Sequence, residues 1–398
     1  MVSLLSLLVF LVPSNLFLVL HHQIGYAAGM RIDYLIPKLY LSDLVAGAFA
    51  TLTLAQYRPR VSKWLIYIGI SWFILLLRQV ATLTPASSLW FFAELSLAGV
   101  VIWSLVQLPK RIREHTGVTW SLASMLGLQS LVAIGQFALQ KSLFGYWFLG
   151  ETNLLHFAGI ASQTIGGQEF ILPSGTTPHP NVLAGVLLIG SVVLWQRRKD
   201  IPRWLLLSTL AVSLFGIGVT FSLSAWLAGM FALGFYGVKS QLDTTHKRIV
   251  LAGVWSLIVL IPLVMSQFSV VSANPSLTRR STLNQVAITT FAAQPLWGTG
   301  LNTFTRGLAL TNTHRILERF VQPAHHVPLL LLAETGLFGV LAGVGILIWL
   351  RKNSSNLDAI LLASCVLVPL ISLDHYLYTL ESGRLAVVVL LLMVLAEE

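Results

Sequence analysis

The chain has 398 residues, of which 56% are hydrophobic and only 10% are charged. A soluble globular protein usually carries about 25% charged residues, so this chain has too few to cover a water-facing surface. The single cysteine, Cys365, excludes an internal disulfide framework. The composition therefore indicates an integral membrane protein with many spans.

Long apolar runs recur along the whole sequence. A bilayer core about 30 Å thick requires a helix of roughly 20 apolar residues, and the runs between charged or Pro/Gly breaks number about twelve. They lie near residues 3–20, 34–55, 64–77, 89–108, 117–139, 181–196, 203–219, 221–238, 249–267, 327–350, 357–373 and 384–396. The runs lack the alternation of barrel strands. The sequence therefore predicts an all-α, polytopic membrane protein that forms a single domain over residues 1–398.

Basic residues are concentrated in alternate connections, and positive charge is normally retained on the cytoplasmic side of a membrane. One side holds most of them: Arg58, Arg60, Lys63, Lys110, Arg111, Arg113, Arg197, Arg198, Lys199, Arg203, Lys239, Lys247, Arg248, Arg351 and Lys352. This bias predicts that the N- and C-termini are both cytoplasmic.

Two connections on the opposite side are long, at residues 140–180 and 268–325. The second precedes the tenth run. Connections longer than about 15 residues without secondary structure are usually functional or disordered. The aromatic residues Trp297, Phe304 and Phe320 argue against disorder in the second. We expect it to fold as short amphipathic helices on the outer face of the membrane.

The charge in segment 268–325 is one-sided. It carries Arg279, Arg280, Arg306, Arg315 and Arg319, with no lysine, against Glu318 alone. Positive charge is normally kept off the outer face, and the planar arginine side chain grips phosphate with two parallel hydrogen bonds. The segment therefore predicts a site for a phosphate-bearing ligand, with contact to anionic lipid headgroups as the alternative. An outer location argues against nucleic acid as a partner.

The sequence from His325 onward reads His325-His326, nine residues, Gly336, two residues and Gly339. This pattern resembles the signature of the O-antigen ligase and O-antigen polymerase superfamily, which are integral-membrane glycosyltransferases that use polyprenyl-diphosphate donors. Three other stretches are similar to the family: His179-Pro-Asn-Val-Leu-Ala-Gly185, Pro295-Leu-Trp-Gly-Thr-Gly-Leu-Asn-Thr-Phe304 and Asp374-His-Tyr376. The family arginine that opens the large loop matches Arg280, with Arg279 as the near alternative.

Two positions depart from the family pattern. His326 stands where the family has Asn, Ser or Gln, although the spacing is intact. Leu223 stands where family members commonly carry an arginine at the start of the eighth span. If that arginine normally holds a phosphate, another residue of this chain must replace it, and Arg306, Arg315 and Arg319 are the candidates.

The resemblance implies a glycosyltransferase of lipopolysaccharide or surface-polysaccharide biosynthesis in a bacterial cytoplasmic (inner) membrane, with its active site facing the exterior. The donor would be a glycan on a polyprenyl diphosphate such as undecaprenyl diphosphate, and the acceptor a hydroxyl of a glycolipid or glycan. Neutral His325 would orient the hydroxyl or accept its proton. The arginines would hold the diphosphate as charge develops on it. The scheme needs neither a metal ion nor another cofactor.

Three alternatives remain open. A polymerase of glycan repeat units would use the same donor and fold as a ligase. A transporter of lipid-linked glycans is a different class, but transporters tend to show internal repeats and polar sites near the bilayer midplane, and no repeat is visible here. A structural scaffold would leave the outer arginines without a reason.

Several other polar residues have both a functional and a structural interpretation. Secondary site candidates are His326, His179, Asn181, Asp374 and His375. The structural interpretation makes His179 and Asn181 caps of the sixth run and Asp374-His375 an interfacial turn. We expect Glu334 to be a buried partner of an arginine, and Gly336 and Gly339 to permit close helix packing. Asp43, Arg78 and Glu94 are expected to be structural charges.

Overall fold

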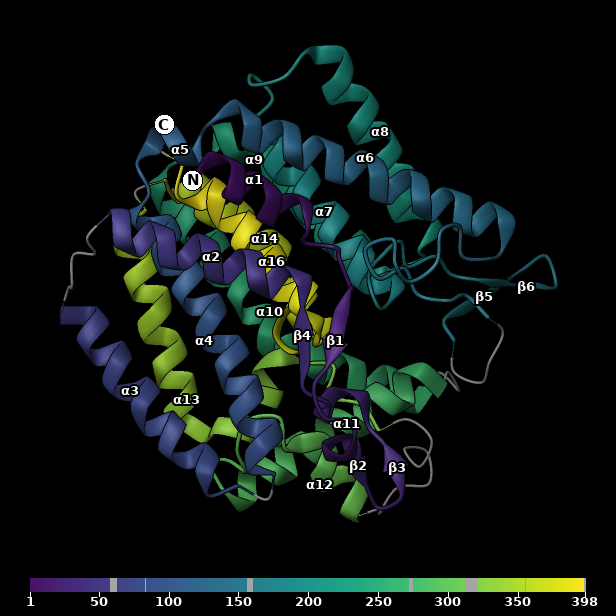
Figure 1. The fold of residues 1–398 in the computed structure, drawn as a ribbon, viewed down its shortest axis with the longest axis vertical. Helices are drawn as coiled ribbons and strands as arrows, with labels where there is room; N and C mark the ends of the chain where they lie inside the picture. Colours follow the sequence, from purple (N-terminus) through teal and green to yellow (C-terminus); the bar gives the residue numbers. More distant parts are fainter. Residues whose placement is uncertain are drawn as a thin grey trace.

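A computed structural model describes residues 1–57, 63–82, 84–155, 160–271, 275–311, 321–354 and 356–396. It is mostly helical, as predicted (Figure 1). The helices of the first half are α1 (Val2–Phe10), α2 (Leu41–Gln56), α3 (Lys63–Val80), α4 (Pro85–Gln107), α5 (Lys110–Arg113), α6 (Thr116–Leu139) and α7 (Pro180–Gln196). Those of the second half are α8 (Arg203–Val219), α9 (Leu223–Val238), α10 (Thr244–Val271), α11 (Pro275–Ala293), α12 (Phe304–Thr311), α13 (Val327–Lys352), α14 (Leu357–Leu373), α15 (Tyr376–Thr379) and α16 (Glu381–Val394). Short 3-10 turns η1, η2 and η3 cover His22–Gly25, Asp33–Leu35 and Lys239–Gln241.

Among the described residues, three small antiparallel sheets depart from the all-α expectation. β1 (Phe17–Val19) pairs with β4 (Lys38–Tyr40), β2 (Tyr26–Ala27) with β3 (Met30–Arg31), and β5 (Ser162–Ile165) with β6 (Gln168–Ile171). The first two lie between α1 and α2, and the third lies in the long 140–180 connection. Each is two-stranded, so these sheets shape loops and do not form a separate β layer.

The expectation of about twelve spans is not confirmed. Among the described residues, four helices are long and apolar enough to cross a membrane: Pro85–Gln107, Lys110–Leu139, Thr244–Val264 and Val327–Lys352. Five apolar helices are shorter: Leu41–Gln56, Leu65–Val80, Pro180–Gln196, Arg203–Val219 and Leu357–Leu373. These apolar helices are compatible with a membrane protein, and every expected apolar run after the first overlaps a helix.

The first expected run, residues 3–20, is not one helix. α1 ends at Phe10, and Pro13 follows at a point where its ring and missing N–H oppose continuation of a helix. The backbone N–H of Asn15 then donates to the carbonyl of Leu149 over 2.8 Å, and the chain turns into β1. Pairing with a distant loop therefore replaces the second half of the predicted span.

The helices pack around a central pair, α14 and α16 (Figure 1, yellow-green and yellow). α14 contacts α9 and α10, α16 contacts α7, and α6 contacts both α1 and α8. Their buried aliphatic side chains form the larger hydrophobic cluster. A second cluster joins α3, α4, α11 and α13. The chain ends labelled N and C lie close together at one end of the bundle, whereas α12 and the β2–β3 hairpin lie at the other (Figure 1).

Helix α13 is interrupted at Gly336, which has φ 62° and ψ −163°. The Pro295–Gly300 segment lies along the interruption: Gly300 N donates to the Glu334 carbonyl over 2.8 Å, and Leu337 N donates to the Pro295 carbonyl over 2.9 Å. The positive φ is one that side chains other than glycine rarely adopt. Gly336 therefore makes a break into which another segment docks, and does not simply permit helix packing as we expected.

Replacing Gly336 with alanine should lower the free energy of unfolding by more than about 2 kcal/mol. The new Cβ would meet the backbone carbonyl of Leu296 at 2.5 Å and would sit on a positive φ. Thermal unfolding in detergent measures the effect. Gly343→Ala is the matched control, because a Cβ there has nothing within 4 Å and lies in the same helix. Equal stability of the two variants would contradict this account of the break.

Candidate active site

One cavity of about 660 Å³ collects most of the predicted site residues. Its lining includes His179, Asn181, Arg279, Arg280, His325, Asp374 and His375. They come from the start of α7, from α11, from the residue before the cap of α13 and from the turn between α14 and α15. Residues that are far apart in the sequence therefore meet at one place.

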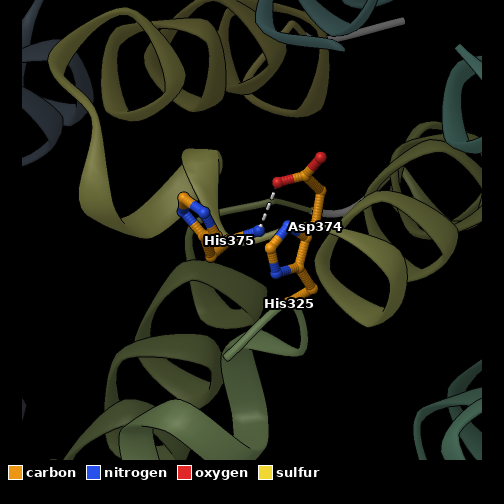
Figure 2. Close-up of side chains that lie close together, drawn as sticks. All are labelled: His325, Asp374 and His375. Carbon is orange, nitrogen blue, oxygen red and sulfur yellow. Dashed lines mark hydrogen bonds between the residues drawn. The ribbon is translucent and has the colours of Figure 1, made fainter. Parts of the chain in front are cut away.

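His325, Asp374 and His375 form the centre of this cavity wall (Figure 2). One ring nitrogen from each histidine and one carboxylate oxygen of Asp374 all lie within 4.8 Å of one another. The two imidazole rings meet edge to face with centroids 4.9 Å apart. The His375 backbone N–H donates to Asp374 Oδ1 over 2.8 Å, the dashed line in Figure 2, and His375 Nδ1 lies 2.7 Å from Thr379 Oγ1.

Asp374 is tied to the first turn of α7. The Asn181 side-chain amide donates to Asp374 Oδ2 over 2.7 Å. His179 Nδ1 accepts the backbone N–H of Asn181 over 3.1 Å and caps the helix. The expectation of a cap is thus confirmed for His179, whereas Asn181 bridges α7 to the carboxylate.

The buried groups of this wall have displaced pKa values. Burial, with His375 and Arg280 nearby, lowers the pKa of His325 well below its ordinary value, and burial lowers the pKa of His375 to about 4. Burial alone would raise the pKa of Asp374, but His325, His375 and Arg280 outweigh it and hold that pKa below its usual range. At neutral pH, His325 is therefore a neutral base beside an ionised carboxylate.

His325 has no hydrogen bond from either ring nitrogen to a residue that the structure describes, and its Nδ1 is buried. A buried polar atom normally has a partner. The unused nitrogens of His325 therefore leave it able to interact with a ligand in the cavity.

Arg280 supplies permanent positive charge to the same wall. Its guanidinium donates to the carbonyl of Leu373, next to Asp374, over 3.2 Å. Arg279 lines the cavity beside it. Arg306, on α12, is not among the cavity-lining residues, and its buried Nε has no partner in the described part of the chain. Arg315 and Arg319 lie outside the described residues.

His325, Asp374 and His375 are also a donor set of the type that holds a transition metal ion. Arg280 opposes a cation there, because its charge acts on all three groups. Both Asp374 oxygens already accept hydrogen bonds. The electrostatics of the wall thus favour an anionic ligand over a metal ion.

His326 is structural. Its Nδ1 accepts the backbone N–H of Leu329 over 3.2 Å, which caps α13, and its Nε2 lies 2.9 Å from the carbonyl of Ile258 on α10. Nε2 must then carry the proton, since a carbonyl can only accept. The side chain is 1% exposed. His326 therefore fixes the start of α13 next to His325, and does not line the cavity.

No arginine of the described residues pairs with Glu334, contrary to expectation. Its carboxylate accepts from the Tyr378 hydroxyl over 3.1 Å and from the Phe304 backbone N–H over 3.3 Å. Leu223, where the family arginine would stand, is 80% exposed at the start of α9 and does not line the cavity. Leu223 therefore contributes no side chain to the cavity in place of that arginine.

Another part of the cavity was not foreseen as belonging to a site. Lys38, Trp90, Glu94 and Arg384 line it. Arg384 Nη2 forms salt bridges with Glu94 Oε2 over 2.7 Å and with Glu381 Oε2 over 2.9 Å. An arginine in an apolar run is itself a signal of function or of a buried partner, so Arg384 was the residue that could have drawn attention to this end.

Comparison with protein-family models and with curated proteins finds no match for the chain.

Proposed function

We propose that the protein transfers a glycan from a polyprenyl-diphosphate donor to an acceptor hydroxyl at the outer face of a bacterial cytoplasmic membrane. The observation that carries the proposal is the joint cavity lining by His325 and Arg280. These residues come from near opposite ends of the 268–325 connection. A neutral base and a fixed guanidinium are what this reaction requires from a protein without a metal.

In the proposed reaction the acceptor oxygen attacks the anomeric carbon of the donor glycan and forms the new glycosidic bond. The bond from that carbon to the diphosphate oxygen breaks, and its electron pair leaves with the polyprenyl diphosphate. The acceptor proton passes to a ring nitrogen of His325. Arg280, with Arg279 beside it, stabilises the negative charge that grows on the diphosphate.

Asp374 acts in this scheme as a positioning residue. Its ionised carboxylate stabilises the imidazolium that His325 becomes, as the carboxylate of a catalytic triad does. Asn181 and the His375 backbone hold that carboxylate in place. Asp374 is buried and His325 is half-buried, so little water reaches the carboxylate to weaken the interaction.

Ligation of one glycan to a glycolipid and polymerisation of repeat units use the same donor chemistry and the same residues. Reconstitution with an undecaprenyl-diphosphate glycan and candidate acceptors separates them. A single-step product on a glycolipid indicates a ligase, and a ladder of lengthening products indicates a polymerase. Movement of the donor across the bilayer without transfer would indicate a transporter and overturn the proposal.

His325→Ala should reduce glycan transfer by about a hundredfold or more, because general base catalysis contributes about that much. The measurement is product formation in proteoliposomes with an undecaprenyl-diphosphate glycan. His22→Ala is the control: His22 is exposed and does not line the cavity. Transfer retained by folded His325→Ala protein would remove the assigned role.

Arg280→Ala should weaken donor use more than Arg280→Lys does. Lysine restores the charge but not the planar pair of donors that matches a phosphate. The initial rate as a function of donor concentration measures the difference, and Arg111→Ala, at an exposed arginine on α5, controls for loss of surface charge. Full restoration of donor use by Arg280→Lys would argue against a two-pronged phosphate contact, and equal loss in the two variants would argue against a contribution from charge alone.

The pH dependence of kcat/KM tests the state of His325. An exposed histidine gains its proton near about pH 6.5. Because burial lowers the pKa of His325, the deprotonated, active base persists to lower pH. We expect kcat/KM to remain on its plateau as the pH falls through about 6.5 and to decline only below it. A decline centred on the ordinary histidine value would show that His325 is not held neutral.

A further inference from the structure

The cavity lining contains a second cation, Lys38, that has no matching anion among the described residues. β4 places Lys38 in the cavity lining. Its ammonium lies 4.7 Å from the centroid of the Phe17 ring on β1. No carboxylate of a described residue forms a salt bridge with it. An aromatic face stabilises an ammonium group less than an acidic partner in a partly buried site does.

The two acidic residues that act on Lys38 are both engaged elsewhere. Asp33 accepts from Arg31 Nε over 3.0 Å. Glu94 lies 2.7 Å from Arg384 and accepts from the indole N–H of Trp90 over 2.8 Å.

Burial lowers the pKa of the Lys38 ammonium by more than Asp33 and Glu94 raise it. The protein therefore does not fully compensate this charge, and an external anion would do so.

Among the described residues, different charged groups shift the pKa values of Lys38 and His325, whereas Asp33 and Asp374 both raise the pKa of Tyr34. The charged groups that act on Lys38 are Asp33, Glu94 and Arg31. Those that act on His325 are His375, Asp374, Arg280 and His179. The two sets share no member. Two cationic positions, Arg280 and Lys38, thus serve different parts of one cavity.

The cavity has room for more than a diphosphate. A volume of about 660 Å³ is typical of sites that enclose a whole small molecule. The lining also includes Trp90, which donates to Glu94, one of the acidic groups that act on Lys38. It includes Asn302 too, whose amide donates to the Tyr34 carbonyl and to Ser87 Oγ over 2.8 Å each. A rigid aromatic ring and fixed polar groups beside a cation suit a sugar that carries an acidic substituent.

We propose that the Lys38 end of the cavity is a second subsite, which binds an acidic sugar through its carboxylate or phosphate group. The anion pairs with Lys38, and the sugar ring lies against Trp90. The part this subsite takes in glycan transfer rests on the proposed function, whereas binding of the acidic sugar does not. The acidic sugar belongs to the donor glycan or to the acceptor glycan.

Binding of soluble probes to the purified full-length protein tests the subsite. The probes are glucuronic acid, glucose 6-phosphate, neutral glucose and inorganic diphosphate, with affinity measured by titration calorimetry or saturation-transfer NMR. Wild-type protein should bind an acidic sugar about tenfold more tightly than glucose, as expected for one partly buried ion pair. Lys38→Gln should abolish that preference and leave inorganic diphosphate binding unchanged. Arg280→Gln should weaken the binding of inorganic diphosphate and leave the preference for the acidic sugar unchanged.

Two variants control for folding and for charge. Lys38→Arg keeps the cation and should keep the preference for the acidic sugar. Lys141→Gln removes an exposed lysine that does not line the cavity and should change neither affinity. A wild-type protein without preference for the acidic sugars would overturn the subsite. The subsite would also be overturned if folded Lys38→Gln lost the affinity for both the acidic sugar and inorganic diphosphate, or if it kept both.

A transfer assay then assigns the acidic sugar to its substrate. Lys38→Gln should raise the KM for whichever substrate carries the acidic group and leave the KM for its neutral counterpart unchanged. An acidic donor tested with a neutral acceptor, and the converse pair, distinguish the two sources. Intact acidic-sugar binding together with absence of any glycan transfer would contradict the proposed function and leave the subsite standing.

Discussion

The buried carboxylate of Asp374 is the group on which the arrangement of the candidate site depends. A carboxylate away from water is costly unless it is paired and hydrogen-bonded, and the chain supplies its partners from separate helices. Asn181 reaches it from α7, the His375 backbone from the α14–α15 turn, and Arg280 adds charge from α11. Satisfying one anion therefore holds three parts of the bundle in register around His325.

The same dependence explains why the two histidines at 325 and 326 differ. His326 has both nitrogens engaged, by the first turn of α13 and by α10, so it cannot take part in chemistry without loosening a helix. His325 makes no hydrogen bond to the described residues and faces a carboxylate. Of these two adjacent histidines, His326 thus anchors the helices and His325 is left free to react.

Sequence reasoning located most helices and most of the candidate site, because apolar runs and short motifs are local properties. His325, Arg280, Asp374 and His179, which were predicted as site residues, all line the cavity. The misses are non-local. Residues 11–20 leave the first helix, since Asn15 bonds to Leu149 and residues 17–19 pair with residues 38–40, and Gly336 breaks α13 because a distant segment docks on it. Lys38 could not be identified as a site residue from the sequence. Its role depends on the fact that Asp33 and Glu94 already pair with Arg31 and Arg384.

The break in α13 has a mechanical consequence. Before it, Val327, Leu330, Ala333 and Glu334 are buried, and the helix is tied to α10 through His326. After it, Leu337, Leu341 and Leu347 are largely exposed. Helices in bilayers adjust their tilt to hydrocarbon thickness at a modest cost per ångström. Because hydrogen bonds through the Pro295–Gly300 segment join the two halves of α13 across the break, any such adjustment of the exposed second half would be passed to the buried half that begins beside His325.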